Sequence, residues 1–153
     1  MESPIASDVR AAEPADVPSL VGLLTAFFAD EGFELPPGGL EARVRTYLAT
    51  KGNAMFLARV AGGDVGVATI ASGYSLEYAW FAEIEDLYVE PVHRGRGLGR
   101  ALVDRACEHA AAIGCSAVLV TVTPEGQDRH DLVGLYVRLG FADEGRRLLE
   151  RRL

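Results

Sequence analysis

The heptapeptide Arg94-Gly95-Arg96-Gly97-Leu98-Gly99-Arg100 carries the strongest structural signal in this chain. An apolar run at residues 84–89 precedes it, and an amphipathic run at residues 98–113 follows it. This order predicts a strand that passes through a glycine-rich turn into a helix. Glycines let backbone N–H groups approach a phosphate closely, and the helix N-terminus and the arginines add positive charge. We therefore expect a site here for a phosphorylated cofactor.

The turn does not fit the two common nucleotide-binding patterns. A dinucleotide-binding fingerprint needs a third glycine where Arg100 stands and an acidic residue about 20 residues further on. A P-loop needs Gly-Lys-Ser/Thr, which the turn lacks. The turn instead reads Arg-x-x-Gly-x-Gly at Arg94, Gly97 and Gly99. This pattern resembles the acetyl-coenzyme A pyrophosphate loop of the GNAT superfamily of N-acetyltransferases, and the alternative is a flexible loop ahead of an ordinary helix.

Three further motifs resemble the same family in the same order. Residues 83–91, Glu-Ile-Glu-Asp-Leu-Tyr-Val-Glu-Pro, resemble its fourth strand, and residues 117–123, Ala-Val-Leu-Val-Thr-Val-Thr, resemble its fifth. Residues 135–141 resemble its Leu-Tyr-x-x-x-Gly-Phe signature. The resemblance implies a single α/β domain over residues 1–153, with a mixed, mostly antiparallel central sheet flanked by helices. It also implies acetyl-coenzyme A as the cofactor, bound where two neighbouring strands splay apart.

Apolar periodicity predicts the elements along the chain. Leucines and phenylalanines recur at helical spacing after a helix start at residues 14–16. Two apolar runs joined by Ala61-Gly62-Gly63-Asp64 predict a hairpin. We expect strands at residues 9–12, 55–60, 65–72, 78–89, 117–122 and 147–153, and helices at 14–28, 40–48, 98–113 and 132–139.

The composition narrows the class of protein. The chain has 153 residues, 49% of them hydrophobic, which suits one domain with a sizeable core. No apolar run approaches the roughly 20 residues of a membrane span, and a signal-peptide pattern is lacking, so we expect a cytoplasmic protein. Cys107 and Cys115 form no metal or redox motif, and we expect no metal site. The net charge of −7 argues against nucleic-acid binding and favours cationic partners such as amines.

Acetyl transfer to an amine needs three kinds of group. A base must remove a proton, because an alkyl ammonium has a pKa of about 10 and no lone pair. Aimed donors must stabilise the oxyanion, and the departing thiolate needs a proton. Strand alternation predicts which side chains share a face of residues 83–89. One predicted face presents Glu83, Glu85, Leu87 and Val89, and the other presents Ile84, Asp86 and Tyr88.

The family resemblance assigns roles along this strand. It implies that the backbone at Leu87, Tyr88 and Val89 binds the acetyl carbonyl and the pantetheine, with the Leu87 N–H as the oxyanion donor. The Glu-Asp-x-x-Val pattern resembles diamine acetyltransferases, whose base occupies the position of Glu85. The Phe-Ala-Glu-Ile string instead resembles lysine acetyltransferases, whose base occupies the position of Glu83. Both carboxylates therefore stay candidates.

The second half of the resemblance concerns the acid and the cofactor. Tyr136 occupies the family's position for the general acid beside the thioester sulfur. The turn at residues 94–100 is implied to hold the pyrophosphate. Many members carry an asparagine seven residues before the tyrosine, where this chain has Arg129. His130 is either a second acid–base group or a loop histidine, and Asp131 suits a helix N-cap.

The acceptor amine is bound in this superfamily by the first two helices, their connecting loop and strand ends near the thioester. The corresponding parts of this chain are rich in aromatic and acidic residues, namely Phe27, Phe28, Asp30, Glu31, Phe33, Tyr74, Tyr78, Trp80, Asp86 and Asp128. Aromatic rings with carboxylates suit a polycationic amine. The small size and acidic balance also resemble small aminoglycoside N-acetyltransferases, so an aminosugar antibiotic is the expected substrate.

Several alternatives stay open. Polyamines and protein amino groups are other acceptors of the same chemistry. A coenzyme A-binding sensor or partner subunit without turnover belongs to a different class. Homodimers are common in the resembled family, and the expected last strand offers an edge for a second copy. Asp86 is expected either to orient substrate or to pair with an arginine.

Overall fold

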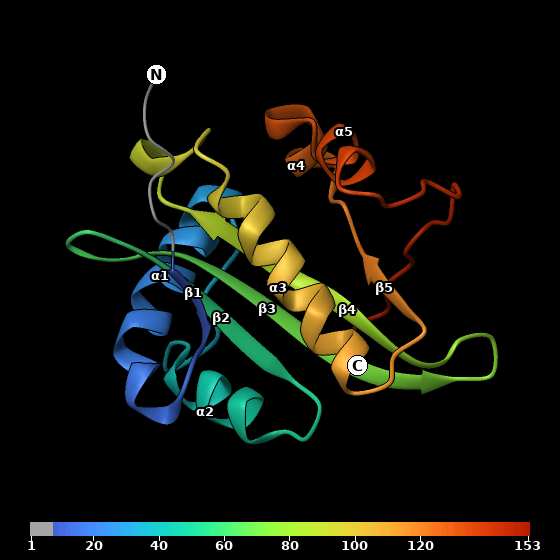
Figure 1. Cartoon of the computed structure of the whole chain (residues 1–153), viewed down its shortest axis with the longest axis horizontal. Coiled ribbons are helices and arrows are strands. Elements are labelled where there is room, and N and C mark those ends of the chain that lie inside the picture. Colours follow the sequence, from blue (N-terminus) through green and yellow to red (C-terminus); the bar gives the residue numbers. More distant parts are fainter. Residues whose placement is uncertain (1–7) are drawn as a thin grey trace.

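One five-stranded sheet organises the chain (Figure 1). The computed structural model describes residues 8–153. Its strands are β1 (Asp8–Ala11), β2 (Ala54–Val60), β3 (Gly63–Ser75), β4 (Ala79–Val89) and β5 (Ala117–Val120), and they lie in this order in the sheet. Its helices are α1 (Val17–Glu31), α2 (Glu41–Ala49), α3 (Leu98–Ala112), α4 (Pro124–His130) and α5 (Leu132–Arg138).

Helices cover both faces of the sheet. Figure 1 shows α3 lying across one face, where it buries the predicted stripe of Leu98, Leu102, Ala106 and Ala110. On the other face, α1 and α2 bury their own apolar side chains against a second set of strand residues. Burying one leucine or phenylalanine contributes about 1.5–3 kcal/mol. The end of β4 is therefore fixed by packing from both sides.

The last two strands splay apart, as predicted. All neighbouring strands are antiparallel except β4 and β5, which are parallel. Their pairing runs only from Phe81 and Ala117 to Ile84 and Val120. β4 then continues to Val89 without this partner. The sheet consequently opens along the second half of β4.

A β-bulge interrupts β4 at the start of this opening. Ile84 pairs with Ile70 of β3, but the next pair along the ladder joins Asp86 to Thr69. Glu85 is therefore an extra residue on β4. A bulge of this kind bends the strand and re-aims the side chains that follow it.

The bulge changes which side chains share a face. Ile84 before it and Leu87 and Val89 after it all pack on the α3 side of the sheet. Strict alternation would place Ile84 and Leu87 on opposite faces. The predicted face that joins Glu83 to Leu87 and Val89 is therefore wrong, because the extra residue shifts the alternation between them.

Two expectations in the C-terminal part also differ from the structure. Residues 142–153 form neither helix nor strand, so the strand expected at 147–153 is wrong. A strand needs a partner with a free ladder, and no described strand pairs with this segment. The short helix α4 was not expected. Thr123 caps α4 by accepting a hydrogen bond from the Gly126 N–H at 3.0 Å, and Pro124 occupies the first turn.

Other expectations are confirmed. The Asp131 side chain caps α5 by accepting from the Gly134 N–H. Gly32, Gly114 and Gly140 follow the ends of α1, α3 and α5 with positive φ, which suits helix termination. Within residues 8–153, no helix has both the length and the apolar sequence needed to cross a bilayer.

Candidate active site

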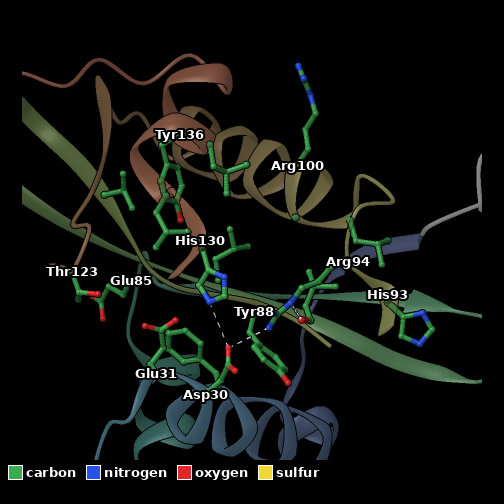
Figure 2. Close-up of a pocket in the computed structure, with 18 of the residues that line it drawn as sticks. Asp30, Glu31, Glu85, Tyr88, His93, Arg94, Arg100, Thr123, His130 and Tyr136 are labelled. Carbon is green, nitrogen blue, oxygen red and sulfur yellow. Dashed lines mark hydrogen bonds and ion pairs between the residues drawn. The ribbon is translucent and has the colours of Figure 1, made fainter. Parts of the chain in front are cut away.

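A cleft of about 380 Å³ opens where β4 and β5 separate (Figure 2). The second half of β4 lines it together with the end of α1, the glycine-rich turn before α3, and the helices α4 and α5. The cleft therefore joins the predicted cofactor turn to part of the predicted acceptor region.

The glycine-rich turn forms one end of the cleft. Gly95 and Gly97 have φ values of 76° and 84°, a left-handed backbone that costs a residue with a Cβ about 1–2 kcal/mol. Gly97 is the N-cap of α3, so the first N–H groups of that helix face the turn. A Cβ at Gly95, Gly97 or Gly99 would meet no atom within 4 Å. The turn is thus open on its outer side, and Arg96 and Arg100 are within and beside it, so it fits a pyrophosphate.

Two backbone N–H groups of β4 point toward the opening. The Glu90 N–H donates to the Val65 carbonyl of β3 at 2.8 Å. N–H direction alternates along a strand, so the N–H groups of Leu87 and Val89 point away from β3, to the side that β5 has left. An extended ligand arm can pair with such groups as an added strand would.

Arg94 binds protein groups on the inner side of the turn. Its Nε donates to the Val89 carbonyl at 2.8 Å, and its Nη2 lies 3.3 Å from the Asp30 carboxylate. Its guanidinium lies 5.6 Å from the centroid of the Tyr88 ring. The Arg94 side chain thus ties the end of β4 to α1, and we retain only its backbone in the proposed phosphate site.

The structure separates the two candidate bases. Glu85 lines the cleft and makes no hydrogen bond or ion pair with another described side chain, whereas Glu83 does not line it. The Glu83 carboxylate accepts a hydrogen bond from the Thr121 hydroxyl at 2.8 Å. Glu85 opens to the cleft, yet desolvation, followed by the charges of Asp86 and Glu83, raises its pKa. A carboxylate of raised pKa that faces the cleft suits a general base.

Tyr136 lies on α5, across the cleft from Glu85 (Figure 2). Its ring is buried and packs edge-on against Phe141, with 5.3 Å between the centroids. Burial, and then the charge of Asp86, raises the pKa of Tyr136 to about 12. The phenol consequently keeps its proton at neutral pH and can donate it.

Aromatic rings and carboxylates surround the other end of the cleft. Phe27 packs against Phe33 and Tyr88, with centroids 6.0 and 6.2 Å apart. Asp30 and Glu31, at the end of α1, line the cleft beside these rings. This end therefore offers both apolar surface and negative charge to an acceptor.

Asp30 connects three parts of the cleft wall. Its carboxylate pairs with Arg94 and lies 3.9 Å from the Nε2 of His130 (Figure 2). Its carbonyl accepts a hydrogen bond from Arg129. The potential ligand atoms of Asp30, Glu31 and His130 lie within 4.8 Å of one another, and the Arg94 guanidinium already supplies positive charge there. Within residues 8–153, Glu31 has no ion pair of its own, so it is the carboxylate at this end that a cationic substrate can engage.

The cleft does not include six of the predicted acceptor residues, namely Phe28, Tyr74, Tyr78, Trp80, Asp86 and Asp128. Tyr74 and Trp80 pack against each other on the β3–β4 hairpin, with 5.2 Å between the centroids. Asp86 directly follows the extra residue of the β4 bulge, and its carboxylate accepts a hydrogen bond from Thr69 rather than pairing with an arginine. None of the six lines the cleft, and their contact with an acceptor stays a prediction.

Comparisons with known sequences agree with this geometry. The model of the acetyltransferase (GNAT) family matches residues 20–141. A glucosamine 6-phosphate N-acetyltransferase of Trypanosoma brucei brucei is 30% identical over 146 residues, which cover 92% of each chain. Glucosamine 6-phosphate N-acetyltransferase 1 of Oryza sativa subsp. japonica is 41% identical over 61 residues, or 40% of this chain and 33% of that protein. For several relatives the match spans a third to about half of their length.

Solved structures show the same fold. An integron cassette protein from the mobile metagenome of Cole Harbour Salt Marsh has a TM-score of 0.82 and 31% identity, with 95% of this chain and 90% of that chain covered. The aminoglycoside N-acetyltransferase AAC(6')-Iy, in complex with CoA, has a TM-score of 0.82 at 20% identity, with 95% and 94% covered. Since the family model spans most of the chain and one relative aligns along nearly all of it, the chain belongs to the GNAT family of acetyltransferases.

Proposed function

We propose that this chain is an acetyl-coenzyme A-dependent N-acetyltransferase whose acceptor is a primary amine of a small cationic aminosugar, of the aminoglycoside type. The observation that carries the proposal is the make-up of one cleft. It has a phosphate-binding turn at one end, and at the other end it has Glu31 and Glu85, two carboxylates without ion pairs among the described residues.

Glu85 is the proposed general base. An ammonium must lose its proton before its nitrogen can attack, and a carboxylate whose pKa is raised is a stronger proton acceptor than an ordinary one. Desolvation and the neighbouring charges of Asp86 and Glu83 raise the pKa of Glu85 in this way. Glu83 is less suited to the role because it does not line the cleft and its carboxylate already accepts a hydrogen bond from Thr121.

Backbone and side-chain donors complete the proposed machinery. Bound acetyl-coenzyme A would supply an acetyl thioester, with its pyrophosphate on the backbone of residues 94–100. The Leu87 N–H points to the open side of β4 and is the proposed donor for the developing oxyanion. Tyr136 holds a proton on its phenol oxygen, with a pKa raised to about 12, and is the proposed acid for the leaving group.

The choice of acceptor rests on charge and on the nature of the relatives. Relatives that align with this chain act on glucosamine 6-phosphate, and structural neighbours include aminoglycoside N-acetyltransferases, so aminosugars are common to both. Within the cleft, Glu31 and Glu85 favour an acceptor with more than one positive charge. The rings of Phe27 and Phe33 add apolar walls that suit the faces of a sugar.

Glucosamine 6-phosphate is the second candidate. Arg129 and His130 lie exposed on α4 near the same end of the cleft and could meet a phosphate. Arg129 already donates to the Asp30 backbone carbonyl, and His130 lies 3.9 Å from the Asp30 carboxylate, so both side chains already contact Asp30. This arrangement favours the cationic acceptor over the phosphorylated one.

Free-thiol release from acetyl-coenzyme A tests the proposal. Separate reactions would contain an aminoglycoside panel, glucosamine 6-phosphate, spermidine and a lysine peptide. The proposal expects the highest kcat/KM with an aminoglycoside and a higher KM for it in Glu31→Gln. Preference for glucosamine 6-phosphate, with a loss in Arg129→Ala but not in Glu31→Gln, would establish the second candidate. Coenzyme A binding without turnover on any amine would favour a sensor or partner subunit.

A further inference from the structure

A buried threonine fills the β4 bulge. Thr69 is 1% exposed, and its hydroxyl donates to the Asp86 carboxylate at 2.5 Å. The same hydroxyl accepts a hydrogen bond from the Asp86 backbone N–H at 3.1 Å. Thr69 therefore satisfies, through one oxygen, both the side chain and the backbone of the residue that follows Glu85.

This double contact lies at the point where the register of the β3–β4 ladder shifts. In a regular strand pair, the Asp86 N–H would donate to a carbonyl of β3. Here the extra residue at Glu85 shifts the register at this point, and a buried N–H without a partner is destabilising. The threonine hydroxyl accepts from this N–H, so a hydroxyl at this position of β3 supports the bulge.

The bulge sets two features of the proposed site. It places the Glu85 side chain in the cleft, and it sets the alternation that directs the Leu87 N–H to the side where β5 has separated. We propose that Thr69 and Asp86 form a positioning pair, which holds Glu85 and the Leu87 N–H in register with the cleft without contacting the substrate. This inference rests on the proposed function, and it concerns residues outside the cleft lining.

Charged and titratable groups face this pair from several elements. The buried hydroxyl of Tyr47 on α2 faces Thr69; burial, and then the charge of Glu85, raises the pKa of Tyr47, whereas interaction with Thr69 lowers it. Burial also raises the pKa of Asp86, while the Thr69 hydrogen bond lowers it. From α5, Tyr136 is close enough to feel the Asp86 charge. Across the cleft lie Glu31 of α1 and His130 of α4.

These electrostatic interactions determine whether loss of the Thr69 hydroxyl raises or lowers the pKa of Glu85. Without Thr69, Asp86 binds a proton more readily, and its charge no longer raises the pKa of Glu85. The pKa of Glu85 should therefore fall toward its ordinary value when the hydroxyl is removed.

The test compares Thr69→Val, which keeps the shape but removes the hydroxyl, with Thr69→Ser, which keeps the hydroxyl. Thr46→Val is the control, because the Thr46 hydroxyl donates to the Ala42 carbonyl within α2, on the exposed side of that helix. We expect Thr69→Val to lower kcat by about tenfold to a hundredfold, the scale of a misplaced catalytic group. Its Kd for coenzyme A should stay near the wild-type value, because the glycine turn is untouched. Thr69→Ser and Thr46→Val should keep both values.

A second readout does not depend on a substrate. The side-chain carboxyl ¹³C signal of Glu85 reports its titration by NMR, and its midpoint should move to lower pH in Thr69→Val but not in Thr69→Ser. If Thr69→Val does not fold, Asp86→Ala and Asp86→Asn replace it: kcat should fall in the alanine variant, and the asparagine variant should retain more because its amide oxygen can still accept from Thr69.

The outcomes separate the inference from the proposed function. A lower Tm in Thr69→Val, with unchanged kcat and an unchanged Glu85 midpoint, would overturn the positioning role and leave Thr69 a packing residue. Wild-type protein that acetylates no amine would instead overturn the proposed function. In that case the NMR midpoints would still decide whether Thr69 positions Glu85.

Discussion

Replacing Gly97 by alanine should weaken coenzyme A binding while leaving the fold nearly intact. Gly97 is exposed, it is the N-cap of α3, and its φ is 84°. A Cβ there would meet no atom within 4 Å, so the added methyl group acts through the backbone and not through a clash. In the free protein the exposed turn can relax to a negative φ, which turns its N–H groups away from the phosphate position.

The size of the effect follows from the cost of restoring the turn on binding. A residue with a Cβ pays about 1–2 kcal/mol in the left-handed region. Because about 1.4 kcal/mol changes an equilibrium tenfold, the Kd for coenzyme A should rise about fivefold to thirtyfold. Isothermal titration calorimetry with coenzyme A measures this change directly.

Gly114 provides a matched control at the other end of the same helix. Its φ is 89°, and a Cβ there would also meet no atom within 4 Å. Gly114→Ala should therefore carry the same strain away from the cleft, lowering Tm by about 2–8 °C without changing the Kd. A wild-type Kd in Gly97→Ala, or an equal loss of affinity in Gly114→Ala, would refute the assignment of the turn as the phosphate site.

Three further predictions concern side chains of the cleft. Because the folded-state pKa of Glu85 is raised, its ionised form opposes folding above that pKa, and the penalty vanishes below the unfolded value of about 4.3. Glu85→Gln should thus raise Tm at pH 8, and thermal melts should show the gain disappearing as the pH falls toward about 4. Tyr136→Phe should lower kcat about a hundredfold. Because the pKa of Tyr136 is about 12, the wild-type phenol keeps its proton at moderately alkaline pH, and a pH–rate profile should show no loss of activity there from this residue. Glu31→Gln should raise the KM for an aminoglycoside roughly twofold to fivefold, as for a partly exposed ion pair, while Glu34→Gln, outside the cleft, should not change it in initial-rate measurements.

The cofactor end of the site could be predicted from the sequence because its signal is local. The glycines at 95, 97 and 99 lie within one turn, and the apolar runs on either side define the strand and the helix. Tyr136 could be placed by its resemblance to a family signature of seven residues at 135–141. The structure brings both to one cleft, although their catalytic roles stay predictions.

The acceptor end could not be predicted as well, because it depends on contacts between distant segments. Arg94 and Asp30 are 64 residues apart in sequence, and nothing local to either residue indicates their ion pair. Tyr74 and Trp80 have the right chemistry for an amine site, but β3 and β4 are long enough to carry them to the far hairpin. A sequence pattern assigns a side chain to a strand or helix, but it does not show where the end of that strand or helix lies in the fold.

The bulge at Glu85 is the most consequential feature that the sequence pattern did not reveal. Residues 83–89 read Glu-Ile-Glu-Asp-Leu-Tyr-Val, a sequence that a regular strand accommodates as readily as a bulged one. Only the pairing with β3 shows the extra residue, and only the fold brings the Thr69 hydroxyl to the Asp86 N–H. The missed helix α4 did have a local signal, since Thr123 and Pro124 form a typical helix start.

The most direct test of the central claim is mass spectrometric detection of acetylated amine, alongside free-thiol release, for wild type and Glu85→Gln with acetyl-coenzyme A and an aminoglycoside panel. We expect one acetyl group on an amine and released thiol in equal amount. The reaction should be slower in Glu85→Gln and most impaired at low pH, where the ammonium form dominates. Equal rates for the two proteins across the pH range would contradict the role of Glu85 as the base. Coenzyme A binding without acetylation of any amine would contradict the proposed activity itself.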